Sequence, residues 1–351
     1  MSIVRKLFYK HYFCHDKFDK KYPFNLTNQA KGYVKNFGEK NPDKTFYVIW
    51  RSFLGSGFFS NFTQVLTHIK AAHHLGMIPV VDFENFKTLY NEQEPINGTK
   101  NSWEYYFKQV SPYSLEEVYQ SKRVYFCHGE TPSYHLFENL EPETMANFYK
   151  GDSYKTFVEK NIFLQENVIK EVEKYSHFFE SRVLGVHFRG KELNVAQLHD
   201  FGPTLEQMFR YTDEILEKYK IEKIFIVTEE KDHFDAFVAK YGDKILASDS
   251  FRVSKVNAYN LKNVRPQHRY LLGMDAVVDS LLLAKCTGLL FGPSGISAHA
   301  SKIGNHEFTY YINNGVNFRK WYLAKYAYRV KKLLPPKFGG LWDKVTITSK
   351  S

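Results

Sequence analysis

The chain has 351 residues, which is enough for two domains with substantial hydrophobic cores. Hydrophobic residues make up 43% of it and aromatic residues 17%, fractions that exclude a mainly disordered protein. The formal net charge of +10 favours an anionic partner, such as a nucleotide, a phosphorylated lipid, nucleic acid or a membrane surface, without choosing among them.

The cysteines and the N-terminal residues indicate the cellular compartment in which the protein is expected. Cys14, Cys127 and Cys286 show no spacing typical of a metal or redox site, and an odd, sparse set favours a reducing compartment. Residues 1–22 are basic and aromatic but contain no apolar stretch long enough for a signal peptide or a membrane span. We therefore expect a cytoplasmic protein, with peripheral contact at the inner face of the cell membrane left open.

The first regular segment predicts a strand, loop, helix and strand. Residues 45–50, TFYVIW, are typical of a short buried strand, and a glycine-containing loop follows over 51–61. Residues 62–76 carry apolar side chains at helical spacing, and 77–83 predict a second strand. This order is typical of a parallel α/β sheet.

The middle of the chain is less regular, from about residue 84 to residue 151. The aromatic cluster at 101–114, NSWEYYFKQVSPYS, indicates either a packed helix or part of an acceptor surface. Residues 153–179 predict one long polar helix that bridges two lobes.

A second, clearer α/β series follows, and its alternation predicts a doubly wound sheet. The predicted strands are 183–188, 223–228, 244–248 and 288–292, and the predicted helices are 204–219, 231–241, 270–286 and one that starts at 293. We accordingly expect an α/β fold with two Rossmann-like lobes facing a central cleft. The predicted parts are an acceptor-side lobe with its bridging helix at 1–178, a nucleotide-binding lobe at 179–305 and a basic, aromatic C-terminal segment at 306–351.

That C-terminal segment carries six Lys or Arg residues between 319 and 332, interleaved with Trp321, Tyr322, Tyr326 and other apolar residues. A basic helix with aromatic residues can lie on an anionic membrane. The other interpretation is a terminal helix that packs one face on the body of the protein and solvates its lysines.

Ligands of doubly wound sheets bind outside the carboxyl ends of the strands. The residues predicted to lie there are His187, Arg189, Thr228, Gly292 and Ser294. An arginine can grip a phosphate through two charge-assisted hydrogen bonds.

In FGPSGIS, residues 291–297, a strand ends and a helix starts, so free backbone N–H groups and hydroxyls face a second phosphate. The candidate phosphate contacts there are Gly292, Ser294, Gly295 and Ser297. Together with Arg189 they predict a diphosphate clamp without a metal, and no D-x-D, H-E-x-x-H or Walker sequence occurs.

Four further candidate residues each have a second interpretation. His187 points the same way as Arg189 and either contacts a nucleotide or is an ordinary core residue. Asp279, on the helix before the last predicted strand, either accepts hydrogen bonds from a base such as guanine or is an ordinary helix residue. Gly57 and Asn61 belong to a loop predicted to close over a nucleotide sugar or an acceptor, although Asp82 on the next strand leaves a dinucleotide site open.

Four segments, in order, resemble motifs of the fucosyltransferase superfamily that includes the nodulation-factor, core α-1,6- and protein O-fucosyltransferases. GVHFRGKE, residues 185–192, resembles its H-x-R-R-x-D motif, and IFIVTEE, residues 224–230, resembles the next strand of the family. The segments at 275–297 and 55–81 resemble its D-x-x-L…S-S region and its glycine loop with the following helix.

The resemblance implies a GT-B type fold, GDP-fucose as donor, and inverting transfer without a metal or other cofactor. Carried over by position, Arg189 holds the β-phosphate and assists departure of GDP, His187 and Asp279 read the guanine, and Ser294 binds phosphate. The sequence departs from the motif at Gly190, where the family has a second arginine, and at Glu192, where it has Asp.

Inverting transfer also calls for a base near the acceptor hydroxyl, and Glu192, His199 and Asp200 are the nearest candidates. We expect a bacterial enzyme that builds a surface polysaccharide, lipopolysaccharide or capsule, on a glycan or lipid-linked glycan acceptor. The alternatives are another sugar nucleotide as donor, or a catalytically silent glycan- or nucleotide-binding protein. Nucleic acid is disfavoured as a partner, because the basic residues are dispersed and no binding motif appears.

Overall fold

The computed structural model describes residues 33–51, 55–126, 153–189, 194–254, 258, 261 and 264–350. The chain divides into two compact units. The first comprises Met1–Asn167 and Gln267–Gly273, and the second comprises Val168–Pro266 and Met274–Ser351. The second unit extends past the predicted boundary at residue 305.

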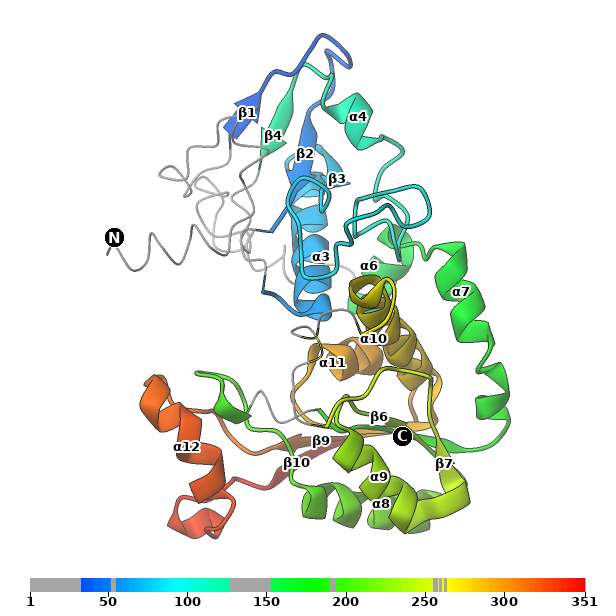
Figure 1. The fold of residues 1–351 in the computed structure, drawn as a ribbon, viewed down its shortest axis with the longest axis vertical. Coiled ribbons are helices and arrows are strands. Elements are labelled where there is room, and N and C mark those ends of the chain that lie inside the picture. Colours follow the sequence, from blue (N-terminus) through cyan, green and yellow to red (C-terminus); the bar gives the residue numbers. More distant parts are fainter. Residues whose placement is uncertain are drawn as a thin grey trace. The chain divides into compact units, whose positions relative to one another are not determined.

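The first unit contains a four-stranded sheet in the order β1-β4-β2-β3 (Figure 1). Its strands are β1 (Tyr33–Lys35), β2 (Phe46–Ile49), β3 (Ile78–Val81) and β4 (Val124–Phe126), and its helices include α3 (Phe58–His74), α4 (Leu115–Val118) and α6 (Tyr154–Asn161). β2 runs parallel to β3 and β4, whereas β1 is antiparallel to β4. The predicted strand, helix, strand unit is confirmed, with the helix starting earlier than expected.

The aromatic cluster at 101–114 is not a helix: the chain makes turns there. Trp103, Tyr105, Tyr106 and Phe107 are all buried, so the cluster is packed into the first unit. The packing interpretation is therefore confirmed, and the helix is wrong.

The predicted bridging helix at 153–179 is also wrong as a single helix. The chain forms α6, then α7 (Glu166–Glu173), then a short 3-10 helix (Ser176–Glu180). Between α6 and α7 the backbone is extended and pairs with the aromatic cluster. The Lys108 amide donates a hydrogen bond to the Phe163 carbonyl at 2.7 Å, and the Gln165 amide donates one to the Tyr106 carbonyl at 2.9 Å. These tertiary hydrogen bonds replace the intrahelical ones.

The second unit contains a six-stranded sheet in the order β10-β9-β8-β5-β6-β7. The strands are β5 (Val183–His187), β6 (Lys223–Val227), β7 (Ile245–Leu246), β8 (Gly288–Phe291), β9 (Phe308–Asn313) and β10 (Lys344–Ser349). All neighbours are parallel except β9 and β10. The predicted parallel series is confirmed, and β9 and β10 extend it.

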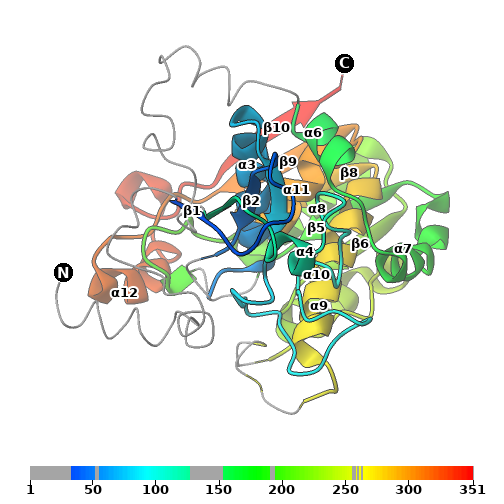
Figure 2. The ribbon, with the colours of Figure 1, turned by 90° about the horizontal axis from the view of Figure 1, so that it is seen from above.

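Helices cover both faces of this sheet (Figure 1, Figure 2). They are α8 (Leu205–Tyr219), α9 (Lys231–Tyr241), α10 (His268–Lys285) and α11 (Gly295–Ile303), whereas α12 (Trp321–Lys331) lies to one side of the sheet in Figure 1. On one face, Val186 packs with Met208 of α8 and Phe237 of α9. On the other, a Cβ at Gly185 would lie 3.0 Å from Leu283 of α10, so this glycine lets the helix approach the strand. The sheet is therefore doubly wound.

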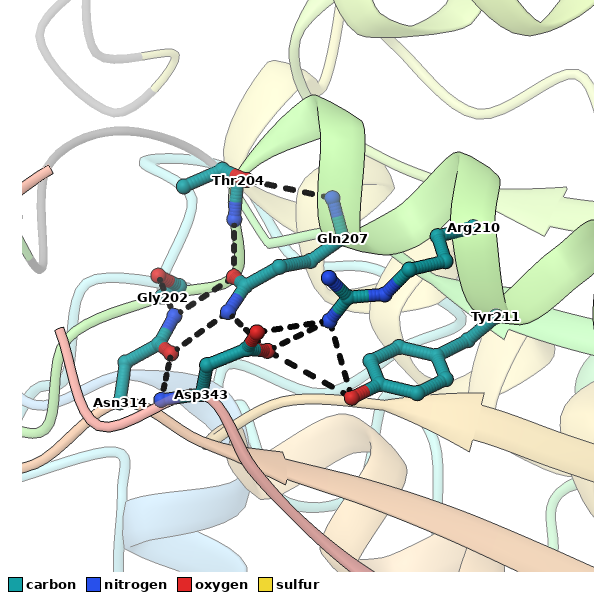
Figure 3. Close-up of polar contacts among 7 residues, drawn as sticks. All are labelled: Gly202, Thr204, Gln207, Arg210, Tyr211, Asn314 and Asp343. Carbon is teal, nitrogen blue, oxygen red and sulfur yellow. Dashed lines mark hydrogen bonds and ion pairs between the residues drawn. The ribbon is translucent and has the colours of Figure 1, made fainter. Parts of the chain in front are cut away.

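A polar network ties the two C-terminal strands to α8 (Figure 3). Thr204 caps α8 in a capping box with Gln207. The Gln207 amide nitrogen donates to Asn314, just after β9, at 2.9 Å and to Asp343, just before β10, at 2.7 Å. Arg210 also donates to Asp343, at 2.7 Å. These bonds fix the ends of β9 and β10 against the start of α8.

Among the described residues, no helix is both long and apolar enough to span a membrane. Residues 1–22, Cys14 and Cys127 lie outside the described residues. Cys286 is a buried free thiol whose pKa is raised by burial.

Candidate functional site

The carboxyl ends of β5, β6 and β8 meet at one edge of the second sheet. His187, the last residue of β5, lies opposite Val227 of β6 and Phe291 of β8. The residues that follow these strands therefore emerge side by side, as the parallel pattern predicted. Arg189 follows β5, Glu229 follows β6 and Ser294 follows β8.

Arg189 contacts both neighbouring loops. Its Nη1 donates to the Ser294 hydroxyl at 3.4 Å, and its Nε lies 3.7 Å from a Glu229 carboxylate oxygen. The Arg189 side chain is 29% exposed, so part of the guanidinium faces solvent. The contact with Ser294 brings together the two residues that were predicted as the diphosphate clamp.

Ser294 is the N-cap residue of α11, and its side chain makes no capping hydrogen bond. Gly295, the first residue of the helix, is exposed. The first backbone N–H groups of a helix have no intrahelical acceptor, and the helix dipole adds partial positive charge there. With Arg189 beside it, this end of α11 has the donors and the charge to bind a phosphate group.

Three other predicted contacts serve the fold in this structure. The buried Ser297 hydroxyl donates to the carbonyls of Gly292 and Ser294, at 3.5 and 3.4 Å, and so holds the turn into α11. A Cβ at Gly292 would lie 2.5 Å from Pro203, which is why glycine is needed. The Thr228 hydroxyl accepts a hydrogen bond from the Glu230 amide at 3.2 Å.

His187 is 3% exposed, and its Nδ1 has no hydrogen-bond partner among the described residues. Burial, reinforced by the nearby Arg189 guanidinium, lowers the pKa of His187 to about 3. The imidazole is therefore neutral at physiological pH. It can accept or donate one hydrogen bond, but it does not exchange a proton near neutrality.

Asp279 lies in a different polar cluster, beyond the end of β7. Its carboxylate accepts hydrogen bonds from Ser248 at 2.5 Å and Ser250 at 2.9 Å, and Arg252 binds the carbonyls of both serines. Burial raises the pKa of Asp279 to about 7. β7 is two strands from β5, or roughly 10 Å across the sheet. Asp279 is therefore not part of the Arg189 and Ser294 cluster.

The three candidate bases are only partly described. Glu192, like Gly190, lies outside the described residues. His199 is exposed, and its carbonyl accepts a hydrogen bond from the Asn317 amide at 2.8 Å. Asp200 forms a bridge with Val316. No described contact joins His199 or Asp200 to Arg189.

Sequence reasoning missed Glu229 as a site residue. Its carboxylate is the acidic group that faces Arg189 across the sheet edge. The available signal was the position of TEE directly after a predicted strand, at the same edge as Arg189. At this distance the Glu229 carboxylate makes no hydrogen bond to Arg189 Nε, but it offsets part of the charge of the guanidinium.

Gly57 and Asn61 belong to the first unit. Gly57 precedes α3 as its N-cap, and Asn61 is buried in the first turns of that helix. Asp82, which left a dinucleotide site open, is fully buried and accepts hydrogen bonds from Tyr119 and Asn85. Its carboxylate is thus engaged within the unit, which argues against a role in binding a ribose.

The described residues contain no group of three or more His, Cys, Asp or Glu side chains placed to hold a metal ion.

No family model and no curated protein matches this sequence. Solved structures do match. The NodZ α-1,6-fucosyltransferase crystallised with GDP is 15% identical, and the match covers 88% of this chain and 99% of NodZ with a TM-score of 0.50. This chain has the NodZ fold. NodZ from Bradyrhizobium in another crystal structure gives 15% identity, the same coverages and a TM-score of 0.49.

A third similar structure is that of POFUT1 in complex with GDP-fucose, at 10% identity, with coverages of 77% of this chain and 96% of POFUT1 and a TM-score of 0.44. The NodZ match confirms the predicted α/β fold of GT-B type and the resemblance to the fucosyltransferase superfamily at the level of the fold.

Proposed function

We propose that this protein is a glycosyltransferase that transfers fucose from GDP-fucose to a glycan acceptor. The observation that carries the proposal is the contact of Arg189 with Ser294 at the free N-terminus of α11. NodZ, whose fold this chain shares, was crystallised with GDP. A site with a guanidinium, a hydroxyl and free backbone N–H groups matches the charge and shape of a diphosphate.

The proposed reaction is inverting and needs no metal. The acceptor hydroxyl attacks the anomeric carbon of fucose, the bond from that carbon to the β-phosphate oxygen breaks, and GDP leaves with the bonding electrons. Arg189 and the N-terminus of α11 stabilise the negative charge that develops on the phosphate. Glu229 offsets part of the charge of the guanidinium. The proton of the acceptor passes to a base, for which Glu192, His199 and Asp200 remain the candidates.

Base recognition is the finer part of the proposal. We assign to Asp279 and His187 the contacts to guanine, and to Thr228, Gly292, Gly295 and Ser297 the support of the phosphate-binding loops. Gly57 and Asn61 are assigned to the sugar or the acceptor. In this assignment, residues 1–178 form the acceptor-side lobe and residues 179–305 the donor lobe.

We further propose that the protein works in the cytoplasm and contacts an anionic membrane through α12. The buried residues of this helix are the small Ala324 and Ala327, whereas Trp321, Tyr326 and Val330 point to solvent with exposures of 68%, 53% and 55%. A helix that only packs on the protein body buries its large apolar residues instead. Exposed aromatic residues among lysines and arginines suit a membrane surface, and a lipid-linked acceptor for surface polysaccharide would be found there.

Calorimetry with GDP, UDP, ADP and CMP in the presence of EDTA tests the donor site. We expect selective GDP binding, weakened about 10- to 100-fold in Arg189→Ala, because a hydrogen bond to a charged group contributes roughly 1.5–3 kcal/mol. Arg189→Lys should recover only part of this loss. Arg182→Ala is the matched control, because Arg182 pairs with Glu307 at the surface of the same unit.

Release of GDP from GDP-fucose with a glycan acceptor, and the anomeric configuration of the product, then test transfer and inversion. Selective binding of another nucleotide would support a glycosyltransferase that uses a different nucleotide sugar as donor. GDP binding without turnover on any acceptor would favour a silent binding protein. Absence of nucleotide binding would refute the donor site.

A further inference from the structure

A group of exposed apolar residues lies at the carboxyl edge of the second sheet. It consists of Val195 and Leu198, in the connection from β5 to α8, and Val316 and Phe318, in the connection from β9 to α12, with exposures of 51%, 62%, 50% and 45%. We call these four residues the loop patch. Because β5 and β9 both run parallel to β8, both connections start at the edge that carries Arg189.

Hydrogen bonds of the buried Asn317 hold the two connections and α12 together. Its backbone amide donates to the His199 carbonyl at 2.8 Å. Its side-chain nitrogen lies 3.2 Å from the Asn194 carbonyl, 3.1 Å from that of Ala196 and 3.1 Å from that of Ala324 in α12. In Figure 1 the green segment that precedes α8 accordingly lies beside α12. The loop patch and α12 therefore belong to one surface.

Leu198 has an unusual backbone conformation for its residue type. Its φ of 58° is in the left-handed region, which residues other than glycine, asparagine and aspartate seldom adopt. Burial does not offset this strain, since the side chain is 62% exposed. Strained residues of this kind cluster at ligand-binding sites and switch regions. The fold thus holds an apolar side chain in solvent at a conformational cost, which indicates that it contacts an apolar partner.

Positive charge flanks the loop patch on the α12 side. Residues 308–342 contain seven lysines and arginines and no aspartate or glutamate. Arg319 and Lys320 directly follow Phe318 and are exposed. Residues 194–203 add one carboxylate, that of Asp200. Apolar side chains flanked by cations match a lipid surface, where the apolar groups enter the boundary of the acyl chains and the cations lie among anionic head groups.

We infer that the loop patch enters an anionic lipid bilayer together with α12, so that the carboxyl edge of the second sheet faces the membrane. The lipid contact of α12 rests on the proposed function, and the loop patch extends that contact to the connection that follows β5. β9 is two strands from β5, or roughly 10 Å across the sheet. A lipid-linked acceptor would therefore reach the proposed donor site around Arg189 from the bilayer.

Leu198→Asn separates lipid binding from folding. Asparagine tolerates the left-handed conformation, so we expect an unchanged or higher Tm. The affinity for vesicles of phosphatidylcholine and phosphatidylserine, measured by co-sedimentation, should fall about 5- to 10-fold, because one apolar side chain no longer enters the lipid. Val238→Ser is the matched control, since Val238 is 40% exposed on α9 of the same unit. This variant should bind vesicles with the affinity of the wild type.

Fluorescence quenching by brominated phosphatidylcholine in the same vesicles tests whether the loop patch itself touches lipid. Leu198→Trp adds an indole at the loop patch, and Val238→Trp adds one on α9. We expect more quenching in Leu198→Trp than in the wild type, and no increase in Val238→Trp. Equal quenching of the two variants would place the loop patch outside the lipid and overturn the inference.

Two further results would also overturn it. One is wild-type affinity of Leu198→Asn for vesicles. The other is a dimer in sedimentation velocity that Leu198→Asn abolishes, without vesicle binding by the wild type, which would assign the surface to a second copy of the chain. Loss of vesicle binding in Trp321→Ser but not in Leu198→Asn would refute the loop patch alone. GDP affinity, measured in the same variants, tests the donor site independently of either lipid contact.

Discussion

At the scale of single residues, the carboxyl edge of the second sheet places the cationic Arg189 beside His187, an imidazole that stays uncharged near neutral pH. His187 is adjacent in space to the Arg189 guanidinium and is buried, and both effects lower its pKa. The positive charge available to a phosphate therefore comes from Arg189 and from the N-terminus of α11. The neutral His187 imidazole can donate or accept one further hydrogen bond.

The pKa of His187 predicts how stability depends on pH. The folded protein holds it at about 3, whereas the unfolded chain has the ordinary value of 6.5. Stability from this group is thus present above pH 6.5 and is lost as pH falls towards 3. Between pH 7 and pH 5 we expect a loss of about 2 kcal/mol.

Urea unfolding at pH 7 and pH 5 measures this loss. His187→Gln should show a smaller decrease than the wild type, while His199→Gln, at an exposed histidine, should match the wild type. An equal decrease in wild type and His187→Gln would contradict a neutral, buried imidazole.

The sequence predicted part of the site around Arg189, from the types of residue that follow the predicted strands. Arg189 and Ser294 could be placed together because parallel strands end at the same edge. Glu229 could not be singled out in the same way, since its pairing depends on how the loop after β6 turns. Nor did the sequence distinguish Gly292 as a packing glycine from a phosphate-binding one, because the neighbour that excludes a Cβ, Pro203, is distant in sequence.

At the scale of elements, tertiary contacts decide where secondary structure stops. The helical pattern of 153–179 is interrupted because residues 162–165 bond to the aromatic cluster. β9 was not predicted, although Phe308–Asn313 alternates buried and partly buried residues along the strand. The alternating pattern of β9 was missed because residues 306–351 were interpreted only from their basic and aromatic composition.

The network in Figure 3 predicts that Asp343 stabilises the second unit. Asp343 has a φ of 49°, a left-handed conformation that Asn tolerates better than Ala. Its side chain is 31% exposed, which weakens the ion pair with Arg210. We expect Asp343→Ala to lower the free energy of unfolding by about 2 kcal/mol. The lost hydrogen bonds account for roughly 1 kcal/mol and the strain of alanine in a left-handed conformation for roughly 1 kcal/mol.

Asp343→Asn should lower the free energy of unfolding by less, because asparagine keeps one acceptor oxygen and tolerates the left-handed backbone conformation. Chemical denaturation at pH 7 measures both variants, with Asp235→Ala as the control because Asp235 makes an exposed ion pair with Lys231. Equal effects of Asp343→Ala and Asp235→Ala would show that the network does not hold β10 to α8.

At the scale of the whole molecule, exposed apolar side chains and positive charge coincide on the segment around α12. In Figure 1, the chain leaves β9, forms α12 and returns as β10. Trp321, Leu333 and Phe338 are the most exposed of its large apolar residues, at 68%, 77% and 67%. We propose that these exposed side chains, set among lysines and arginines, form an interaction surface.

Co-sedimentation with lipid vesicles tests this surface. We expect binding to vesicles that contain phosphatidylserine, weaker binding to pure phosphatidylcholine, and a decrease at high salt, because charge attraction is screened. The triple variant Trp321→Ser, Leu333→Ser, Phe338→Ser should lose binding by at least about 10-fold, given roughly 1.5–3 kcal/mol for each large apolar residue fully buried.

Phe163→Ser is the control, since Phe163 is 54% exposed but belongs to the first unit. GDP affinity should be equal in all of these variants. Binding that is insensitive to lipid charge, or that survives the triple substitution, would contradict a membrane-binding role for the segment from Trp321 to Phe338.

The sequence by itself determined the α/β class, the parallel second series and the residues at its strand ends, because periodicity, chain order and the handedness of parallel connections are local or nearly local properties. Only the tertiary structure decided which of those residues touch. In the folded protein Arg189 contacts Ser294 and Glu229, and Asp279 accepts hydrogen bonds from Ser248 and Ser250. Asn61 Oδ1 has no hydrogen-bond partner among the described residues, although it is buried beside aromatic rings. The large apolar side chains of α12 are exposed to solvent. Each of these depends on contacts between residues far apart in the chain, where burial and the satisfaction of hydrogen bonds outweigh local preference.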